Sequence, residues 1–80
     1  MNDDAVLQSI NELMGEEHTL LKAAEAGGLT DQQRQRLHAV KVQLDQCWDL
    51  LRQRRAKREF GQDPDAAQPR DESTVEGYKA

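Results

Sequence analysis

The sequence contains a single cysteine, Cys47, so no disulfide bond can form within the chain. Its two histidines, His18 and His38, do not combine with Cys47 in the spacing of a zinc site. A domain of 80 residues buries a modest part of its surface, and small domains commonly need a disulfide, a metal or a partner chain. The sequence therefore predicts no metal site and no cofactor, and it favours association with another chain.

Long hydrophobic runs are also missing, and none approaches the roughly 20 apolar residues of a membrane-spanning helix. The first residues, Met1 to Asp4, are acidic, whereas a secretory signal begins with basic residues. With the single cysteine, these features predict a cytoplasmic protein that does not enter membranes. The chain has no glycine-rich phosphate loop, nucleophile elbow or paired-cysteine motif. We therefore expect a protein that is not an enzyme.

Proline is absent from the first 63 residues, so nothing there interrupts a long helix. A first helix is predicted over about residues 3–26, because Asn2, Asp3 and Asp4 are all good N-caps and Gly27-Gly28 is a good C-terminal stop. Its apolar residues recur at the heptad spacing of a helical seam. They are Val6, Ile10, Leu13, Leu20 and Ala24, with Glu17 in the vacant seam position.

A second helix is predicted over about residues 31–60. Thr30 and Gln33 have the spacing of a capping box at its start, and Gly61 and Pro64 supply its stop. Its seam residues follow the same steps of three and four: Leu37, Val40, Leu44, Cys47 and Leu51.

The connection between the two helices is only a few residues long, which makes them antiparallel neighbours. We therefore predict an all-α fold, a two-helix hairpin over residues 1–60 with a coiled-coil-like seam. The register places Leu13 near Leu44 and Val6 near Leu51. At the vacant seam position we expect Glu17 to form an ion pair with Lys41, since a carboxylate in a seam is costly without a partner.

Other apolar residues flank the two seams, and one partner helix cannot cover both a seam and the residues beside it. They are Leu7, Met14 and Leu21 on the first helix, and Trp48 and Leu50 on the second. Such a surface is typical of an association site. The simplest closed solution is a homodimer of hairpins that forms a four-helix bundle. A different protein partner, or the chain's own C-terminal tail, could cover the same residues.

Charge is divided along the chain: residues 1–26 carry six acids and one base, whereas residues 31–59 carry eight bases and four acids. The bases are densest in a run formed by Arg52, Arg54, Arg55, Lys57 and Arg58. The run could contact the phosphates of a nucleic acid or another anion, or it could dock to an acidic protein partner. The competing interpretation is structural, because cations stabilise the C-terminal end of a helix and the hairpin brings Asp3 and Asp4 beside them.

Residues 61–80 contain both prolines, many acids and few large apolar residues. This composition predicts a polar, flexible tail. Val75 and Tyr78 are the side chains that could anchor it to the hairpin.

The segment Leu44-Asp45-Gln46-Cys47-Trp48-Asp49-Leu50-Leu51-Arg52-Gln53-Arg54-Arg55 is distinctive, as are Glu16-Glu17-His18 and Val75-Glu76-Gly77-Tyr78. Together they resemble a family of short, mainly actinobacterial proteins known as domain of unknown function 2630. The resemblance covers nearly the whole chain and implies no activity, substrate or cofactor. The sequence thus predicts a non-enzymatic helical interaction protein, with a nucleic-acid-associated or transcription-accessory protein as the alternative.

Overall fold

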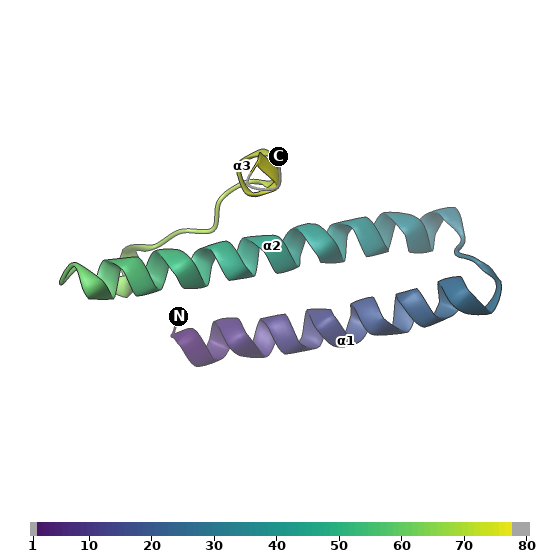
Figure 1. Ribbon diagram of the computed structural model, residues 1–80, viewed down its shortest axis with the longest axis horizontal. Helices are drawn as coiled ribbons and strands as arrows, with labels where there is room; N and C mark the ends of the chain where they lie inside the picture. The colour runs from purple at the N-terminus through teal and green to yellow at the C-terminus, as the bar shows by residue number, and fades with distance from the viewer. Residues whose placement is uncertain (1, 78–80) are drawn as a thin grey trace.

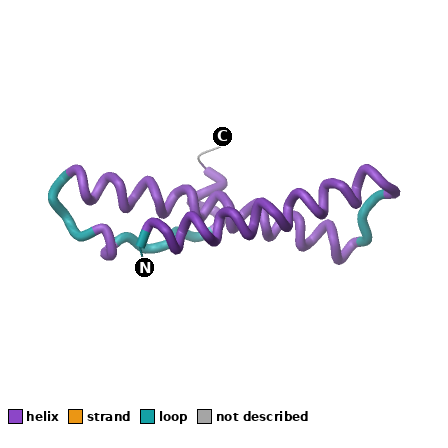
Figure 2. The backbone as a smooth tube through the Cα atoms, turned by 90° about the horizontal axis from the view of Figure 1, so that it is seen from below, coloured by secondary structure: helices purple, strands orange, loops and turns teal. Residues whose placement is uncertain are grey.

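The computed structural model describes residues 2–77, which form helices and connecting segments without a strand. Helix α1 spans Asp3–Gly27 and helix α2 spans Asp31–Glu59, and a 3-10 helix η1 (Pro64–Ala66) and a short helix α3 (Glu72–Gly77) follow. The two long helices run antiparallel as a hairpin (Figure 1). Loops occupy the two ends of the molecule and part of the tail (Figure 2). The predicted all-α hairpin is therefore confirmed.

Local capping explains where α1 begins and ends. The Asn2 side chain accepts a hydrogen bond of 2.8 Å from the backbone N–H of Ala5. At the other end Gly28 has a φ of 89°, which glycine adopts without steric cost, and its N–H donates to the Ala24 carbonyl at 3.0 Å. The helix ends one residue beyond its predicted bound.

The predicted capping box of α2 is present. The Thr30 hydroxyl accepts from the Gln33 N–H at 3.1 Å, and the Gln33 side chain accepts from the Thr30 N–H at 2.9 Å. At the C-terminal end Gly61 has a φ of 72°, and the Gln62 N–H donates to the Lys57 carbonyl at 2.7 Å. These contacts turn the chain back toward the hairpin.

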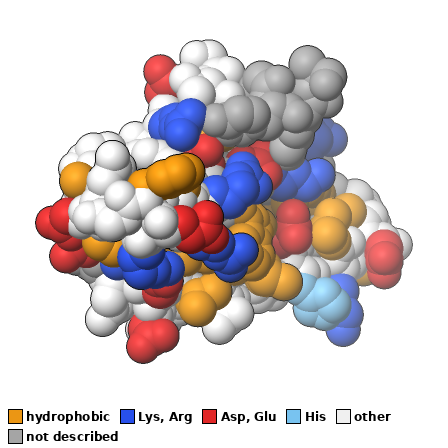
Figure 3. Space-filling view, turned by 60° about the vertical axis from the view of Figure 1, so that its left-hand side comes forward, with side chains coloured by type: hydrophobic (Ala, Val, Ile, Leu, Met, Phe, Trp, Pro, Cys, Tyr) orange, Lys and Arg blue, Asp and Glu red, His pale blue; other side chains and the backbone are white. Residues whose placement is uncertain are grey.

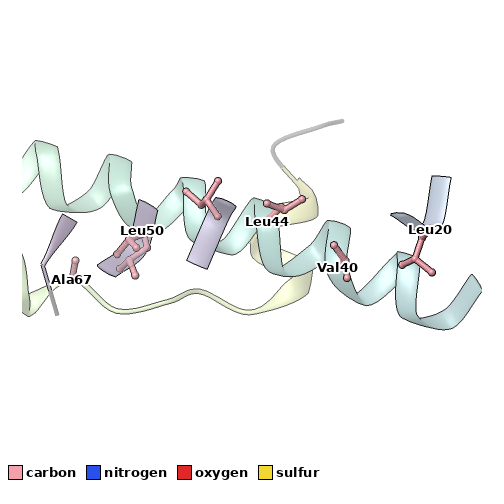
Figure 4. Packing of buried hydrophobic residues seen from close by; sticks show 7 residues of the cluster. Leu20, Val40, Leu44, Leu50 and Ala67 are labelled. Carbon is pink, nitrogen blue, oxygen red and sulfur yellow. The ribbon is translucent and has the colours of Figure 1, made fainter. Parts of the chain in front are cut away.

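The core consists mainly of predicted seam residues, extended by Leu50 of α2 and by Ala67 of the tail. Its buried side chains are Val6, Ile10 and Leu20 from α1, Val40, Leu44 and Leu50 from α2, and Ala67 from the tail. Four partly buried seam residues pack against them: Leu13, Leu37, Cys47 and Leu51. Figure 4 shows the core spread along α2, from Leu20 at one end to Ala67 at the other. Ala24, the last predicted seam residue of α1, is exposed.

After η1 the tail runs back along α2, and α3 lies on the side of α2 that faces away from α1 (Figure 1). Both η1 and α3 contact α2, and Ala67 and Val75 are buried, with Val75 only 2% exposed. These contacts favour a tail that is held on α2 over one that moves freely. Val75 is therefore an anchor, as the sequence allowed, while Tyr78 lies outside the described residues.

Candidate functional site

Among the described residues, five large apolar side chains remain exposed after the hairpin and the tail have packed: Phe60 at the end of α2, and four that flank the seam. Leu7, Met14 and Leu21 of α1 and Trp48 of α2 have exposed fractions of 42–50%. The spacing of seven residues places the first three on one line of α1. Met14 and Trp48 line the same surface hollow of about 450 Å³, so the α1 line adjoins α2 there. We call these four residues the apolar flank.

Leu50 was also predicted to belong to the association surface, and this prediction is wrong. It is only 6% exposed and lies in the core cluster with Ala67. Two residues along an α-helix turn the side chain by about 200°, so Leu50 and Trp48 project to opposite flanks of α2. The segment that follows α2 returns over the Leu50 flank and leaves the Trp48 flank open.

The predicted Glu17–Lys41 ion pair is not formed among residues 2–77. Both side chains line the hollow beside Met14 instead. The ion pair that joins the two helices at this level lies one position earlier, where Arg36 Nη2 donates to Glu16 Oε1 at 2.7 Å. The Arg36 guanidinium lowers the pKa of the Glu16 carboxyl. Because Glu17 is only half-buried, water can solvate its carboxylate and no buried partner is needed.

The five residues of the predicted basic run fall into two groups. Arg54 is 5% exposed, and its Nε donates to Asp3 Oδ1 at 2.7 Å while its Nη1 donates to Asp65 Oδ1 at 2.8 Å. Arg58 donates to both oxygens of Asp3, at 3.1 and 2.5 Å. Hydrogen bonds from Arg58 and Arg54 lower the pKa of Asp3 to about 2. These two arginines therefore fasten α1 and the tail to the end of α2.

The remaining members of the run are Arg52 and Arg55, which are exposed, and Lys57, which is half-buried. Arg52 and Arg55 are three residues apart and lie on the same side of α2 as Trp48. The run is thus not one cationic surface. Its structural interpretation holds for Arg54 and Arg58, and a phosphate could be contacted only by the other three.

A stripe of α2 that the sequence analysis did not single out binds the tail. We call it the tail-binding stripe: His38, Val42, Gln46, Asp49 and Gln53, at helical steps of three and four. Gln46 Nε2 donates to the Arg70 carbonyl at 3.1 Å, and Gln53 Nε2 donates to the Gln68 carbonyl at 2.8 Å. The two amides therefore hold the backbone of an extended segment.

Asp49 is the buried charge of this stripe, with an exposed fraction of 2%. Its Oδ2 accepts from Gln53 Nε2 at 2.8 Å and lies 3.2 Å from Nε of Arg70. At the far end of the stripe, His38 Nε2 lies 3.0 Å from Glu72 Oε1. The stripe was missed because four of its five residues are polar, a pattern that also describes a solvent-facing side of a helix.

No group of three or more metal-ligand side chains gathers within residues 2–77. Burial raises the pKa of the Cys47 thiol, as expected for a cysteine that packs in a core rather than one that reacts as a thiolate. No helix in the described part of the chain is long and apolar enough to cross a membrane. The apolar flank and the exposed cations next to it are therefore the surface with the most distinctive chemistry.

The chain matches, over residues 2–80, a family described as a protein of unknown function (DUF2630). It is 44% identical over 77 residues to an uncharacterized protein of Mycobacterium bovis, in an alignment that covers 95% of this chain and 88% of that protein. Uncharacterized proteins from two strains of Mycobacterium tuberculosis show the same identity and coverage. No solved structure matches. The resemblance seen in the sequence is confirmed, and the chain belongs to the DUF2630 family.

Proposed function

We propose that this protein is a non-enzymatic helical interaction module that self-associates through the apolar flank. The observation that carries the proposal is the 42–50% exposure of Leu7, Met14, Leu21 and Trp48 in a chain whose tail is already docked elsewhere. Figure 3 shows hydrophobic side chains gathered in the middle of one face, with cationic and anionic side chains around them. Exposed apolar patches with a polar rim are typical of association sites.

Energy also supports self-association. Complete burial of a large apolar side chain contributes roughly 1.5–3 kcal/mol, so burial of the half that is still exposed contributes about 1 kcal/mol for each of the four residues. A small domain has little stability to spare, which makes such a gain valuable. The free, partly buried Cys47 suits a reducing compartment, and we propose that the protein acts in the cytoplasm.

Sedimentation equilibrium at micromolar concentration tests the proposal. We expect a species of about 18 kDa, twice the 9.1 kDa of the chain. Leu7→Glu and Leu21→Glu should shift the population to the monomer, because each places a charge in the interface. Phe60→Glu is the matched control, since Phe60 is 78% exposed but lies outside the apolar flank.

A species of 9.1 kDa at every concentration would refute self-association. The apolar flank would then belong to a different protein partner. Dissociation by Phe60→Glu as strong as that by Leu7→Glu would show that added charge, rather than the flank, disrupts the assembly.

A further inference from the structure

The exposed apolar residues of α1 have the same order and spacing in both directions along the helix. Leu7 and Leu21 each lie seven residues from Met14, which corresponds to about 10.5 Å along the axis. A second copy of α1 turned end for end therefore presents leucine, methionine and leucine at the same heights. Such a match lets two copies of α1 pack against each other about a two-fold axis perpendicular to the helix.

The polar residues between these positions also fit the reversal. Asn11 lies three residues before Met14 and His18 lies four residues after it, and both are exposed on the same side of α1. In a reversed copy Asn11 faces His18 of the second copy, and His18 faces Asn11. An amide and an imidazole can form hydrogen bonds with each other, so neither is buried without a partner.

The residues of α2 beside Met14 are also arranged symmetrically about the level of Met14. Leu44 lines the hollow that Met14 lines, and it lies three residues after Lys41 and four residues before Trp48. A two-fold axis at this level brings Lys41 of one copy to Trp48 of the other. An ammonium group over an indole ring is a favourable cation–π contact.

In a rival arrangement the two-fold axis of the dimer runs parallel to the helices, so that the acidic α1 of one copy faces the basic α2 of the other. This arrangement satisfies the charges, but in the hairpin register it sets Met14 and Leu21 against positions around Lys41 and Arg34 and leaves only Leu7 near an apolar residue, Trp48. Exposed charge pairs contribute little because water screens them, whereas burial of apolar area contributes more. In the reversed arrangement Asp4 approaches Glu25 at the ends, where both are exposed and the repulsion is screened.

The size of the surface agrees with a dimer. Helix α1 is roughly 37 Å long, and two adjacent helices are about 20 Å wide. The face is thus roughly 700 Å², close to the about 800 Å² that each partner buries in a stable complex.

Resting on the proposed function, we propose that a second copy packs with its α1 antiparallel to the first, about a two-fold axis beside Met14. Leu7 then meets Leu21 of the second copy, Met14 meets Met14, and Lys41 meets Trp48. This arrangement specifies which residues lie close across the interface and is therefore open to cross-linking.

Disulfide cross-linking of the full chain in a Cys47→Ser background tests the arrangement. A disulfide requires Cα atoms about 4.4–6.8 Å apart. Met14→Cys alone should cross-link to itself, and Leu7→Cys mixed with Leu21→Cys should cross-link to each other after subunit exchange and oxidation. Leu7→Cys alone and Leu21→Cys alone should not form a cross-link, because the two copies of either residue lie about 21 Å apart along the helix axis. Circular dichroism of each variant checks that helicity is kept.

Cross-linking of Leu7→Cys with itself would overturn the antiparallel arrangement in favour of a parallel one. Cross-linking of Leu7→Cys with Trp48→Cys would establish the rival in which α1 faces α2. If none of the α1 variants cross-links while sedimentation still gives a dimer, the arrangement is wrong and the proposed function stands. If the unmodified chain sediments as a monomer, the proposed function fails as well.

Discussion

Arg54 Nε lies 2.7 Å from Asp3 Oδ1, a contact that joins the end of α2 to the first turn of α1 across 51 residues of sequence. The same guanidinium reaches Asp65 and the Pro64 carbonyl, at 2.8 and 3.3 Å. One side chain thus holds both helices of the hairpin and the start of the tail.

Replacement of Arg54 should destabilise the protein more than replacement of its neighbour. Arg54→Gln removes one of the two arginines that contact Asp3 and the arginine that contacts Asp65, and it leaves a buried amide in place of the guanidinium. Arg55→Gln is the matched control, because Arg55 is exposed and adjacent. We expect the melting temperature to fall by several degrees for Arg54→Gln and to change little for Arg55→Gln. Equal melting temperatures for the two variants would show that the Arg54 contacts do not stabilise the fold.

The Asp3 contacts also predict a dependence of stability on pH. Hydrogen bonds from Arg58 and Arg54 lower the pKa of Asp3 from 3.8 to about 2. A carboxyl with a lowered pKa stabilises the folded state above its unfolded pKa, and this contribution is lost as the pH falls through the folded pKa. The melting temperature of the unmodified protein should therefore fall between pH 3.8 and about 2 more steeply than that of Asp3→Asn.

Asp4→Asn is the control for this titration, since Asp4 is the next residue of α1 and its side chain is exposed. It should retain the steep fall of the unmodified protein. Curves of Asp3→Asn and the unmodified protein that run parallel across the window would contradict the role given to Asp3.

Helix bounds and the seam could be predicted from the sequence because local contacts determine them. The Thr30–Gln33 capping box and the turn at Gly28 each depend on residues within four positions. The seam follows from the helical period alone, which is why Ile10 and Val40 were placed in the core and are buried there.

The path of the tail could not be predicted, and the error at Leu50 follows from it. Leu50 and Trp48 flank the same seam with similar hydrophobicity, and only the returning segment buries one of them. Likewise Glu16 and Glu17 are adjacent, and a helical period cannot tell which of them reaches a cation on α2. The contact of Arg54 with Asp65 joins two segments whose relative position cannot be predicted from a local sequence pattern.

The anchoring of the tail by Val75 is a further testable feature. Val75→Asp places a charge at a position that is 2% exposed, so we expect residues 61–77 to leave α2 while the hairpin remains helical. Thr74→Asp is the control, because Thr74 is the preceding residue and is exposed. Backbone NMR order parameters should be near 0.85 for the tail of the unmodified protein and of Thr74→Asp, and below about 0.6 for Val75→Asp. Low values in the unmodified protein would mean instead that the tail is flexible, as its composition predicts.

The basic run gives the last prediction, which concerns nucleic acid. Arg54 and Arg58 are held by Asp3 and Asp65, so any phosphate contact by the run would fall to its other three members: Arg52, Arg55 and Lys57. A slope of log affinity against log salt of about −0.9 is expected for each phosphate contact on duplex DNA. If the protein binds mixed-sequence DNA at low salt, the magnitude of the slope should therefore not exceed about 3.

The double variant Arg52→Gln, Arg55→Gln should reduce the magnitude of this slope by about two. Arg34→Gln, at the opposite end of α2, should leave it unchanged. A slope near −5 in the unmodified protein would require Arg54 and Arg58 to release their carboxylates, and it would contradict their contacts with Asp3 and Asp65. Absence of binding at low salt would remove the nucleic-acid alternative and leave the run as a structural feature of the helix end.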